Sequence, residues 1–494
     1  MKAPPDRPDN DIEALAKGGR TNVAGFFARL IARIPFLIIG SQFYGAEALG
    51  RLAYAIVVVE FAAQLSTLGL KRGLALHMNG IGKENGAWDA ILVVVGATLI
   101  PTIGLMLIPQ VMFPNSQINP LDYLLPLAIP ALALSDIMLA ALAYRFNVVA
   151  SVRARAIIEP WTISIAAVAL WWSLPRDGLL VAYALSMGAA LIASIIPFLI
   201  SYGLPRNWTP RGAELYALAR HNVPLAAADA IEWGSRRIDL IILGLFVSPA
   251  TVGIYWVAQQ IASLPQKLKT SFDPVLGPAI TRKLGEGDKA AVARQISQVG
   301  FWIIAAQAGV ALALGIPGEA LMGLIGPGRD FVGGSGALAL LLLAEVVAAV
   351  AVVSEAALVY LARHRNLMIS LGMIGMQIGL SFGFVIGVKN AGYPELYQAA
   401  GPALALAISL GCASLIKAKL AAHMLQAPVS IWRPALPIAA AAAVVVGQLA
   451  IRGPEWAELT LGIPGILLVY SAIIWRYGFK DEDRVLFRKS RPSS

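Results

Sequence analysis

The sequence has few charged residues and almost no cysteine, and both shortages narrow the class of protein. Only 14% of the 494 residues are Asp, Glu, Lys or Arg, against roughly 25% in soluble domains, whereas 58% are apolar. The single cysteine, Cys412, allows neither a disulfide framework nor a thiolate metal site. These shortages exclude a disulfide-stapled fold and indicate that lipid is the main solvent of the chain.

Motifs of nucleotide-dependent and metal-dependent chemistry are also missing. No Gly-rich phosphate-loop spacing precedes an expected helix, and no metal constellation or nucleophile triad is present. The histidines all map to loops or span edges: His77, His221, His364 and His423. We therefore expect no enzyme activity, no histidine proton relay and no cofactor, apart from a possible coupling Na⁺ or H⁺.

Long apolar runs recur along the chain, each long enough to cross the ~30 Å hydrocarbon layer at about 1.5 Å per residue. They predict an all-α integral membrane protein with about fourteen transmembrane helices. The predicted spans are 22–43, 49–70, 87–113, 121–144, 156–175, 178–203, 222–247, 250–276, 300–326, 336–362, 366–388, 396–416, 434–452 and 459–477.

The Lys and Arg residues alternate between loops as the positive-inside rule requires. Most of the 39 lie in the N-terminal tail, the even-numbered loops and the C-terminal tail, which places both termini in the cytoplasm. The first residues lack the apolar core of a signal peptide. Short outer loops leave no room for an outer catalytic domain, and the scattered basic residues form no stripe for nucleic acid.

An internal repeat relates two halves of the chain at an offset of 203 residues. The segment EALGRLAYA at 47–55 aligns with ATVGIYWVA at 250–258, so that Gly50 matches Gly253. Spans one and seven, and two and eight, then correspond in place and direction. The predicted parts are a cytoplasmic tail (1–21), a six-helix N-lobe (22–203), a cytoplasmic linker (204–221), a six-helix C-lobe (222–416), two additional helices (434–477) and a basic cytoplasmic tail (478–494).

The second copy of the repeat begins a series of short motifs. They are Gly253-Ile-Tyr-Trp-Val-Ala, Leu264-Pro265, Phe272-Asp273-Pro274-Val275-Leu276-Gly277-Pro278 and Leu284-Gly285-Glu286-Gly287-Asp288, with a fainter copy in Ala48-Leu49-Gly50 and Leu68-Gly69-Leu70. This series resembles the polysaccharide-transporter branch of the multidrug/oligosaccharidyl-lipid/polysaccharide exporter superfamily, which includes O-antigen and lipid II flippases.

The resemblance implies two pseudo-symmetric lobes in a V around a central cavity that opens alternately to the two sides. It implies a flippase that moves an undecaprenyl-pyrophosphate-linked oligosaccharide outward across the bacterial inner membrane, for lipopolysaccharide or exopolysaccharide synthesis. The expected partners are that lipid-linked oligosaccharide, membrane lipids and other polysaccharide-assembly proteins.

Ionisable residues inside spans are costly unless they face a cavity or each other, so they are the default functional candidates. Arg29 and Arg33 share a face of the first span, where a guanidinium can bind pyrophosphate through paired hydrogen bonds. Arg33 lies about 16 Å from the cytoplasmic edge, whereas the shallower Arg29 also fits an interfacial anchor. Glu60 in the second span lies at a similar depth, which predicts an Arg33–Glu60 ion pair, either a structural strut or a pair exchanged when phosphate arrives.

The seventh span is unusually charged. On a continuous helix, Asp229, Glu232, Arg236 and Asp239 fall within an arc of about 80°, whereas Arg237 points elsewhere. Such a cluster either binds a coupling cation or proton or forms an internally neutralised network.

In the eighth span, Gln260 and Lys267 share a polar face and are candidate substrate ligands, and Pro265 is expected to kink the helix. Asp136 and Glu355 have no partner that the sequence identifies. Acidic residues outnumber basic ones well inside the spans. This favours a second hypothesis for the function, a cation-coupled multidrug or small-molecule exporter of the same superfamily. A third hypothesis, an integral-membrane glycosyl-transfer enzyme, is disfavoured by the short outer loops.

Overall fold

All regular structure in the described part of the chain is helical. The computed structural model describes residues 34–80, 83–145, 147–205, 207–270, 280, 283–480 and 483. Among these residues, ten helices are long and apolar enough to cross a membrane, and a further apolar helix, α18 (Ala435–Ala450), is shorter. The chain is thus a multi-pass membrane protein of the all-α class, as predicted, and the count of fourteen spans stays a prediction.

The described residues form two compact units. The first unit contains residues 34–256 and 325–327, and the second contains 257–324 and 328–483. Helix α11 (Pro249–Thr270) begins in the first unit and continues in the second. Helix α9 (Gly212–Ser235) begins inside the segment 204–221 that was predicted as a linker, and it packs on α2 and α3 within the first unit.

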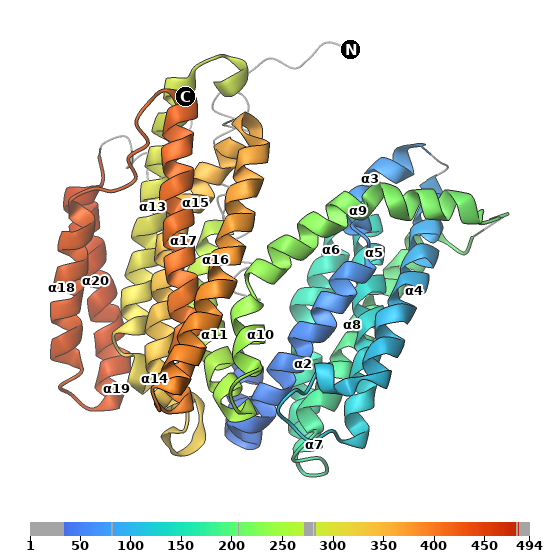
Figure 1. Cartoon of the computed structure of the whole chain (residues 1–494), viewed down its shortest axis with the longest axis horizontal. Helices are drawn as coiled ribbons and strands as arrows, with labels where there is room; N and C mark the ends of the chain where they lie inside the picture. The colour runs from blue at the N-terminus through green and yellow to red at the C-terminus, as the bar shows by residue number, and fades with distance from the viewer. Residues whose placement is uncertain are drawn as a thin grey trace, which may run out of the picture. The chain divides into compact units, whose positions relative to one another are not determined.

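The first unit holds the helices that position the candidate site. In chain order these are η1 (Gly40–Tyr44), α2 (Gly45–Ser66), α3 (Leu70–Gly80), α4 (Lys83–Leu107), η2 (Pro109–Val111), η3 (Pro120–Leu127), α5 (Ala128–Tyr144), α6 (Val148–Val152), η4 (Arg153–Ile158), α7 (Glu159–Trp171), α8 (Gly178–Tyr202), α9, α10 (Ile238–Gly244) and the start of α11 (Figure 1). Helix α2 ends because Leu68 and Gly69 have φ angles of 49° and 71°, in the left-handed region that stops a helix.

Apolar burial holds these helices together. Helix α8 packs against α5 and α7, and α2 packs against α5 and α9. Fully buried side chains such as Leu49, Leu52, Ile129 and Phe198 form the core between them. Each such side chain contributes about 1.5–3 kcal/mol when it is removed from water, but in lipid the gain comes from close packing instead.

A buried ion-pair cluster fastens the first unit near the start of α2. The Arg51 guanidinium lies 2.8 Å from an Asp122 oxygen and 3.0 Å from an Asp177 oxygen, and its own side chain is 2% exposed. It also donates a hydrogen bond to the Gln117 carbonyl oxygen, and Asn119 donates one to Asp177. One cation therefore connects α2, the 108–120 loop and the segment before α8, which explains an arginine on the predicted outer side.

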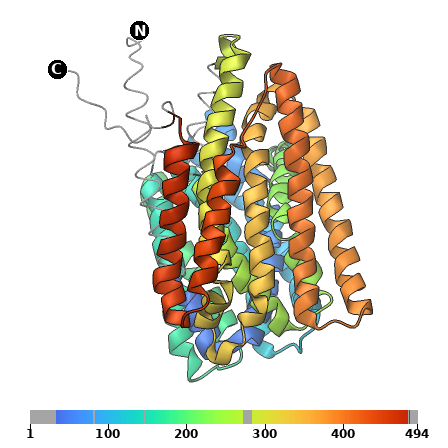
Figure 2. The same cartoon turned by 90° about the vertical axis from the view of Figure 1, so that its left-hand side faces the viewer.

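The second unit contains four helices of 27 to 31 residues and the two additional helices predicted at 434–477. Its elements are the rest of α11, α13 (Lys289–Gly315), α14 (Gly318–Ile325), η5 (Pro327–Arg329), η6 (Val332–Gly334), α15 (Ser335–Leu361), α16 (Arg363–Asn390), α17 (Glu395–Leu425), α18, α19 (Glu455–Ala457), η7 (Glu458–Gly462), α20 (Ile463–Ile473) and η8 (Ile474–Gly478). Helices α18 and α20 lie side by side and pack on α13 (Figure 2). Gly309 of α13 permits this contact, because a Cβ atom there would lie 2.9 Å from the Tyr470 ring.

A polar cluster connects the chain after α20 to the middle of α13. Asp483, whose side chain is 1% exposed, accepts hydrogen bonds from the Arg433 guanidinium and from the Trp302 indole, the latter at 3.0 Å. The Arg433 guanidinium lies 3.9 Å from the centre of the Phe301 ring. Burial raises the pKa of Asp483, but the hydrogen bonds from Arg433, Lys480 and Trp302 outweigh it and hold the pKa below its usual value.

We expect Asp483→Asn to destabilise the second unit by about 1–3 kcal/mol at neutral pH, because Arg433 loses its charged partner. A depressed folded-state pKa stabilises the fold above the unfolded-state pKa of about 3.9, and the stabilisation is lost as the pH falls through the folded value. Thermal unfolding in detergent should therefore separate the variant from wild type at pH 7 and progressively less below pH ~4. The exposed Asp330→Asn is the matched control, and an equal effect of both substitutions would contradict the stabilising role of Asp483.

Candidate functional site

The predicted seventh span is not one continuous helix. Helix α9 ends at Ser235, Arg236 and Arg237 lie in a turn, and α10 begins at Ile238. The arc of about 80° expected for Asp229, Glu232, Arg236 and Asp239 is therefore wrong, because a helical wheel does not continue across a turn. Arg236 is exposed, whereas Arg237 is half-buried.

The break between α9 and α10 brings Arg237 near Glu60. The Arg237 guanidinium lies 4.0 Å from the Glu60 carboxylate, and both side chains are about a third exposed (30% and 29%). Beside this pair, the Phe61 ring stacks on the Trp233 ring with centroids 5.4 Å apart. Glu60 therefore faces the turn between α9 and α10, a contact that the sequence did not predict.

Asp136 has two cationic partners, although the sequence identified none. The Arg155 guanidinium and the Lys71 ammonium both bind its carboxylate, the lysine at 3.1 Å. Arg155 also pairs with Glu159 at 2.9 Å, one turn along the chain. Its π-helical segment, η4, displaces the side chains from α-helical spacing, which is why periodicity could not place Arg155.

An unpaired hydroxyl lies among these charges. Tyr183 on α8 is 4% exposed, and its hydroxyl has no hydrogen-bond partner within the described residues. The charges that act on it are those of Glu60, Arg155, Glu159 and Arg237. A buried hydroxyl needs a partner, so this position suits water or a polar group of a bound molecule.

Asp229 and Asp239, the other acidic candidates, lie in different surroundings. Asp229 on α9 is 3% exposed and lies 2.9 Å from the Arg72 guanidinium of α3. Asp239 on α10 is fully buried and accepts a hydrogen bond of 2.6 Å from the Tyr255 hydroxyl.

The remaining substrate-binding candidates are only partly described. Arg29 and Arg33 lie outside the described residues. Gln260 is half-buried on α11, and Lys267 lies on the same helix, but its side chain and that of Glu232 lie outside the described part. Their roles, and the predicted Arg33–Glu60 pair, stay predictions.

The second unit has a comparable polar cluster. The Lys417 ammonium, 5% exposed, lies 3.1 Å from the Glu355 carboxylate and donates a hydrogen bond of 3.0 Å to Ser370. Asn366 donates to the other Glu355 oxygen at 3.3 Å. Glu355 is thus held by two helices, α16 and α17, and is not isolated. No group of three or more His, Cys, Asp or Glu residues that could hold a metal occurs in the described ranges.

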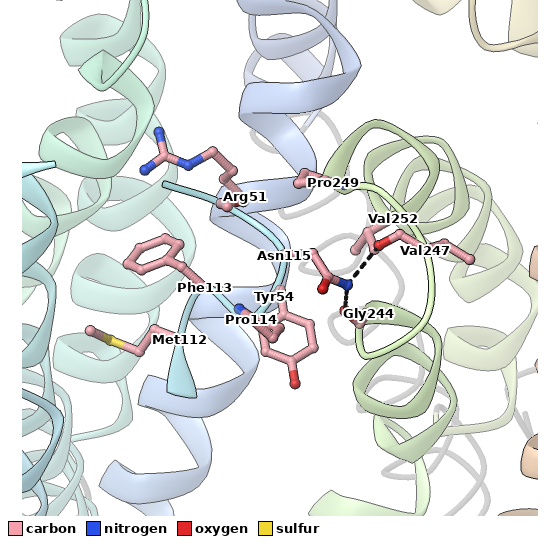
Figure 3. Close-up of a pocket in the computed structure, with 12 residues that line it drawn as sticks. Arg51, Tyr54, Met112, Phe113, Pro114, Asn115, Gly244, Val247, Pro249 and Val252 are labelled. Carbon is pink, nitrogen blue, oxygen red and sulfur yellow. Dashed lines mark hydrogen bonds between the residues drawn. The ribbon is translucent and has the colours of Figure 1, made fainter. Parts of the chain in front are cut away.

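A small pocket lies beside the start of α11, lined by Arg51, Tyr54 and Asn115 among others (Figure 3). Its cavity volume of about 10 Å³ is far below the roughly 300–1,000 Å³ of pockets that hold small molecules. Asn115 closes one side by donating hydrogen bonds of 2.8 and 3.0 Å to the carbonyl oxygens of Gly244 and Val247. The pocket is therefore not a substrate site.

We expect Arg155→Met to lower stability by about 1–3 kcal/mol, because Asp136 and Glu159 lose a charged hydrogen-bond donor while Lys71 remains. Arg153→Met is a matched control, since Arg153 is exposed on the same π-helical segment. Thermal unfolding of the two purified variants measures the difference. Equal midpoints would show that the network contributes nothing to the fold.

Comparison with known proteins relates the chain to one family and one fold. A model of the polysaccharide biosynthesis protein family matches residues 41–311, slightly more than half of the chain. A search among curated proteins finds no match. Among solved structures, the chain is similar to the lipid II flippase MurJ in an inward closed conformation, with a TM-score of 0.70 and 14% identity over 92% of this chain and 99% of that one.

Two multidrug transporters share the fold. An inward-facing MATE transporter of the MOP superfamily gives a TM-score of 0.64 at 12% identity, over 81% of this chain and 95% of that one. A variant of the Vibrio cholerae MATE transporter VcmN gives 0.56 at 13% identity, over 84% of this chain and 100% of that one. At these identities the structural similarity shows the fold alone. The family match, together with this fold, confirms the resemblance that the sequence motifs indicated.

Proposed function

The chain belongs to the polysaccharide biosynthesis protein family, and from this membership we propose that it is a flippase for a lipid-linked oligosaccharide. It moves an undecaprenyl-pyrophosphate-linked oligosaccharide outward across the bacterial inner membrane by alternating access, alongside other polysaccharide-assembly proteins. The family match carries the proposal. The fold shared with the lipid II flippase supports it, since that protein is by its name a flippase.

The cargo would be held by its diphosphate. Arg29, Arg33 and Lys267 bind the phosphate oxygens in this proposal, because guanidinium and ammonium groups form charge-assisted hydrogen bonds with them. Gln260 contributes an amide on the helix that carries Lys267. Glu60 acts as the exchangeable acid in this proposal, because its contact with Arg237, at 4.0 Å, is longer than a hydrogen-bonded ion pair.

A cation gradient would drive the transport cycle through the acidic residues of α9 and α10. Asp229, Glu232 and Asp239 are the proposed binding groups for H⁺ or Na⁺, with Arg236 as the competing cation. The Arg72–Asp229 contact supports a switching role, because protonation of Asp229 would weaken this ion pair.

A deletion strain tests the proposal. Loss of the chain should remove a surface polysaccharide and leave its lipid-linked precursor on the cytoplasmic side, and expression of the chain should restore export. A deletion strain that makes every surface polysaccharide normally, and accumulates no lipid-linked precursor, would contradict the proposed function.

The second candidate function is a cation-coupled multidrug exporter. The similarity to MATE transporters and the buried acids Asp229 and Asp239 favour it, because an acidic interior suits cationic drugs. Resistance to cationic drugs on overexpression, without any polysaccharide phenotype, would support the exporter over the flippase.

A further inference from the structure

The proposed function gives no role to His77 of α3, although its ring is packed into the first unit. A Cβ atom on Gly86 of α4 would lie 3.4 Å from the imidazole Cδ2 atom, so the ring lies directly against that helix. The Nε2 atom of His77 is buried and has no hydrogen-bond partner within the described residues. A neutral imidazole tolerates this position far better than an imidazolium, which would need an anion beside it.

Asp89 of α4 is the acidic group whose charge acts on His77. It lies one turn after Gly86, on the face of α4 that meets the imidazole. The Oδ1 atom of Asp89 already accepts a hydrogen bond of 2.8 Å from the indole of Trp208. Trp208 therefore uses the carboxylate that a protonated His77 would need.

Trp208 fastens the chain that joins α8 to α9. Its ring packs on Trp88 with centroids 6.2 Å apart, and the Trp88 ring meets Phe198 of α8 at 5.3 Å. Trp208 is half-buried, whereas most described residues of the segment 203–211 are exposed. The backbone of Asn207 has a φ angle of 51°, a left-handed conformation that a non-glycine residue keeps only where its surroundings hold it. The indole therefore holds an exposed stretch of chain against the first unit.

The other described charged groups on the helices that pack against α3 are paired or exposed. They are Asp136 of α5 (with Lys71 and Arg155), and on α9 Glu214 (with Arg211), Arg220, His221 and Asp229 (with Arg72). Asp89 is therefore the acid that a protonated His77 can recruit within the described part of the chain.

We propose that His77 is an acid switch on the connection between α8 and α9: its protonation draws Asp89 away from Trp208 and releases the segment 203–211. In the predicted topology this region lies in the cytoplasm, so cytoplasmic water supplies the proton. Burial holds the pKa of His77 below its ordinary value, and the charge of Asp89 offsets this only in part. The neutral form therefore stabilises the contact above pH ~6.5, and this stabilisation is lost as the pH falls through the lower folded-state value.

Hydrogen exchange of the purified, full-length chain tests the switch. The amides of Glu214 and Leu215 donate hydrogen bonds to the Arg211 carbonyl oxygen and report on the segment, whereas the amides of α8 report on wider unfolding. After correction for intrinsic exchange, lowering the pH from about 7.5 to about 5.5 should reduce protection at 203–215 several-fold and leave α8 unchanged. Equal protection of 203–215 at the two pH values would overturn the proposal. The measurement involves no transport, so its result is independent of the proposed function.

Substitutions at four positions separate the switch from a general effect of acid. His77→Gln and Asp89→Asn should each abolish the pH response and keep wild-type protection at neutral pH, because Gln gains no charge and Asn still accepts the indole hydrogen bond. His221→Gln, at an exposed histidine of α9, should respond as wild type does. Trp208→Phe should show low protection at both pH values, because the indole donor is lost. A wild-type pH response in His77→Gln or in Asp89→Asn would overturn the proposal.

Discussion

Replacing Arg51 with methionine is expected to destabilise the first unit by about 3–5 kcal/mol, because Asp122 and Asp177 would then be left without their shared cation. Methionine fills much of the arginine volume, so the loss reports on charge rather than on an empty space. For a unit of this size, such a loss lowers the unfolding midpoint by roughly 6–20 °C. Thermal unfolding of the purified protein in detergent measures it.

Two further variants make this result interpretable. Arg176→Met removes an exposed arginine next to Asp177 and should change stability by less than about 0.5 kcal/mol. Adding Asp122→Asn to Arg51→Met should recover part of the loss, because it removes a buried, unpaired charge. An unfolding midpoint for Arg51→Met equal to that of Arg176→Met would contradict the assigned role of the cluster.

Replacing Arg33 with alanine is expected to abolish surface polysaccharide while the protein still reaches the membrane. In the proposed function this guanidinium binds the diphosphate with two parallel hydrogen bonds, and alanine offers none. Arg33→Lys retains the charge but not the paired geometry, so we expect partial export. The measurement is surface polysaccharide in a deletion strain, normalised to the amount of membrane-inserted chain.

The matched control for this substitution is Arg365→Ala, an exposed arginine in the first turn of α16. Its export should equal that of wild type. Wild-type export by Arg33→Ala would remove this residue from the substrate site, while the fold and the family membership would be unaffected.

The sequence predicted the fold class well because the relevant signals are local. Apolar runs longer than the bilayer thickness and the alternation of basic loops do not depend on how helices pack. The charged contacts depend on packing and were not predicted. Asp136 meets Arg155 through a π-helical turn, and Glu60 meets Arg237 because α9 ends one residue before Arg236. No periodicity argument identifies either irregularity in advance.

The contact of Gly50 with α11 and of Gly253 with α2 was also not predicted from the sequence. Alignment of the internal repeat made the two glycines equivalent, but equivalent positions in a repeat need not touch. The structure brings the two equivalent positions together on one crossing, with each glycine against the carbonyl one turn before the other. The two glycines of the repeat are therefore required by a close helix–helix contact that only glycine permits.

Transport by the purified protein tests the central claim most directly. The chain would be reconstituted into liposomes with a fluorescent undecaprenyl-pyrophosphate oligosaccharide, and an impermeant enzyme or quencher added outside would report the accessible fraction. We expect the accessible fraction to change with time only in vesicles that contain the chain, and to respond to an imposed Na⁺ or H⁺ gradient. Equal rates in protein-free vesicles and in vesicles with folded, correctly inserted chain would contradict the flippase assignment.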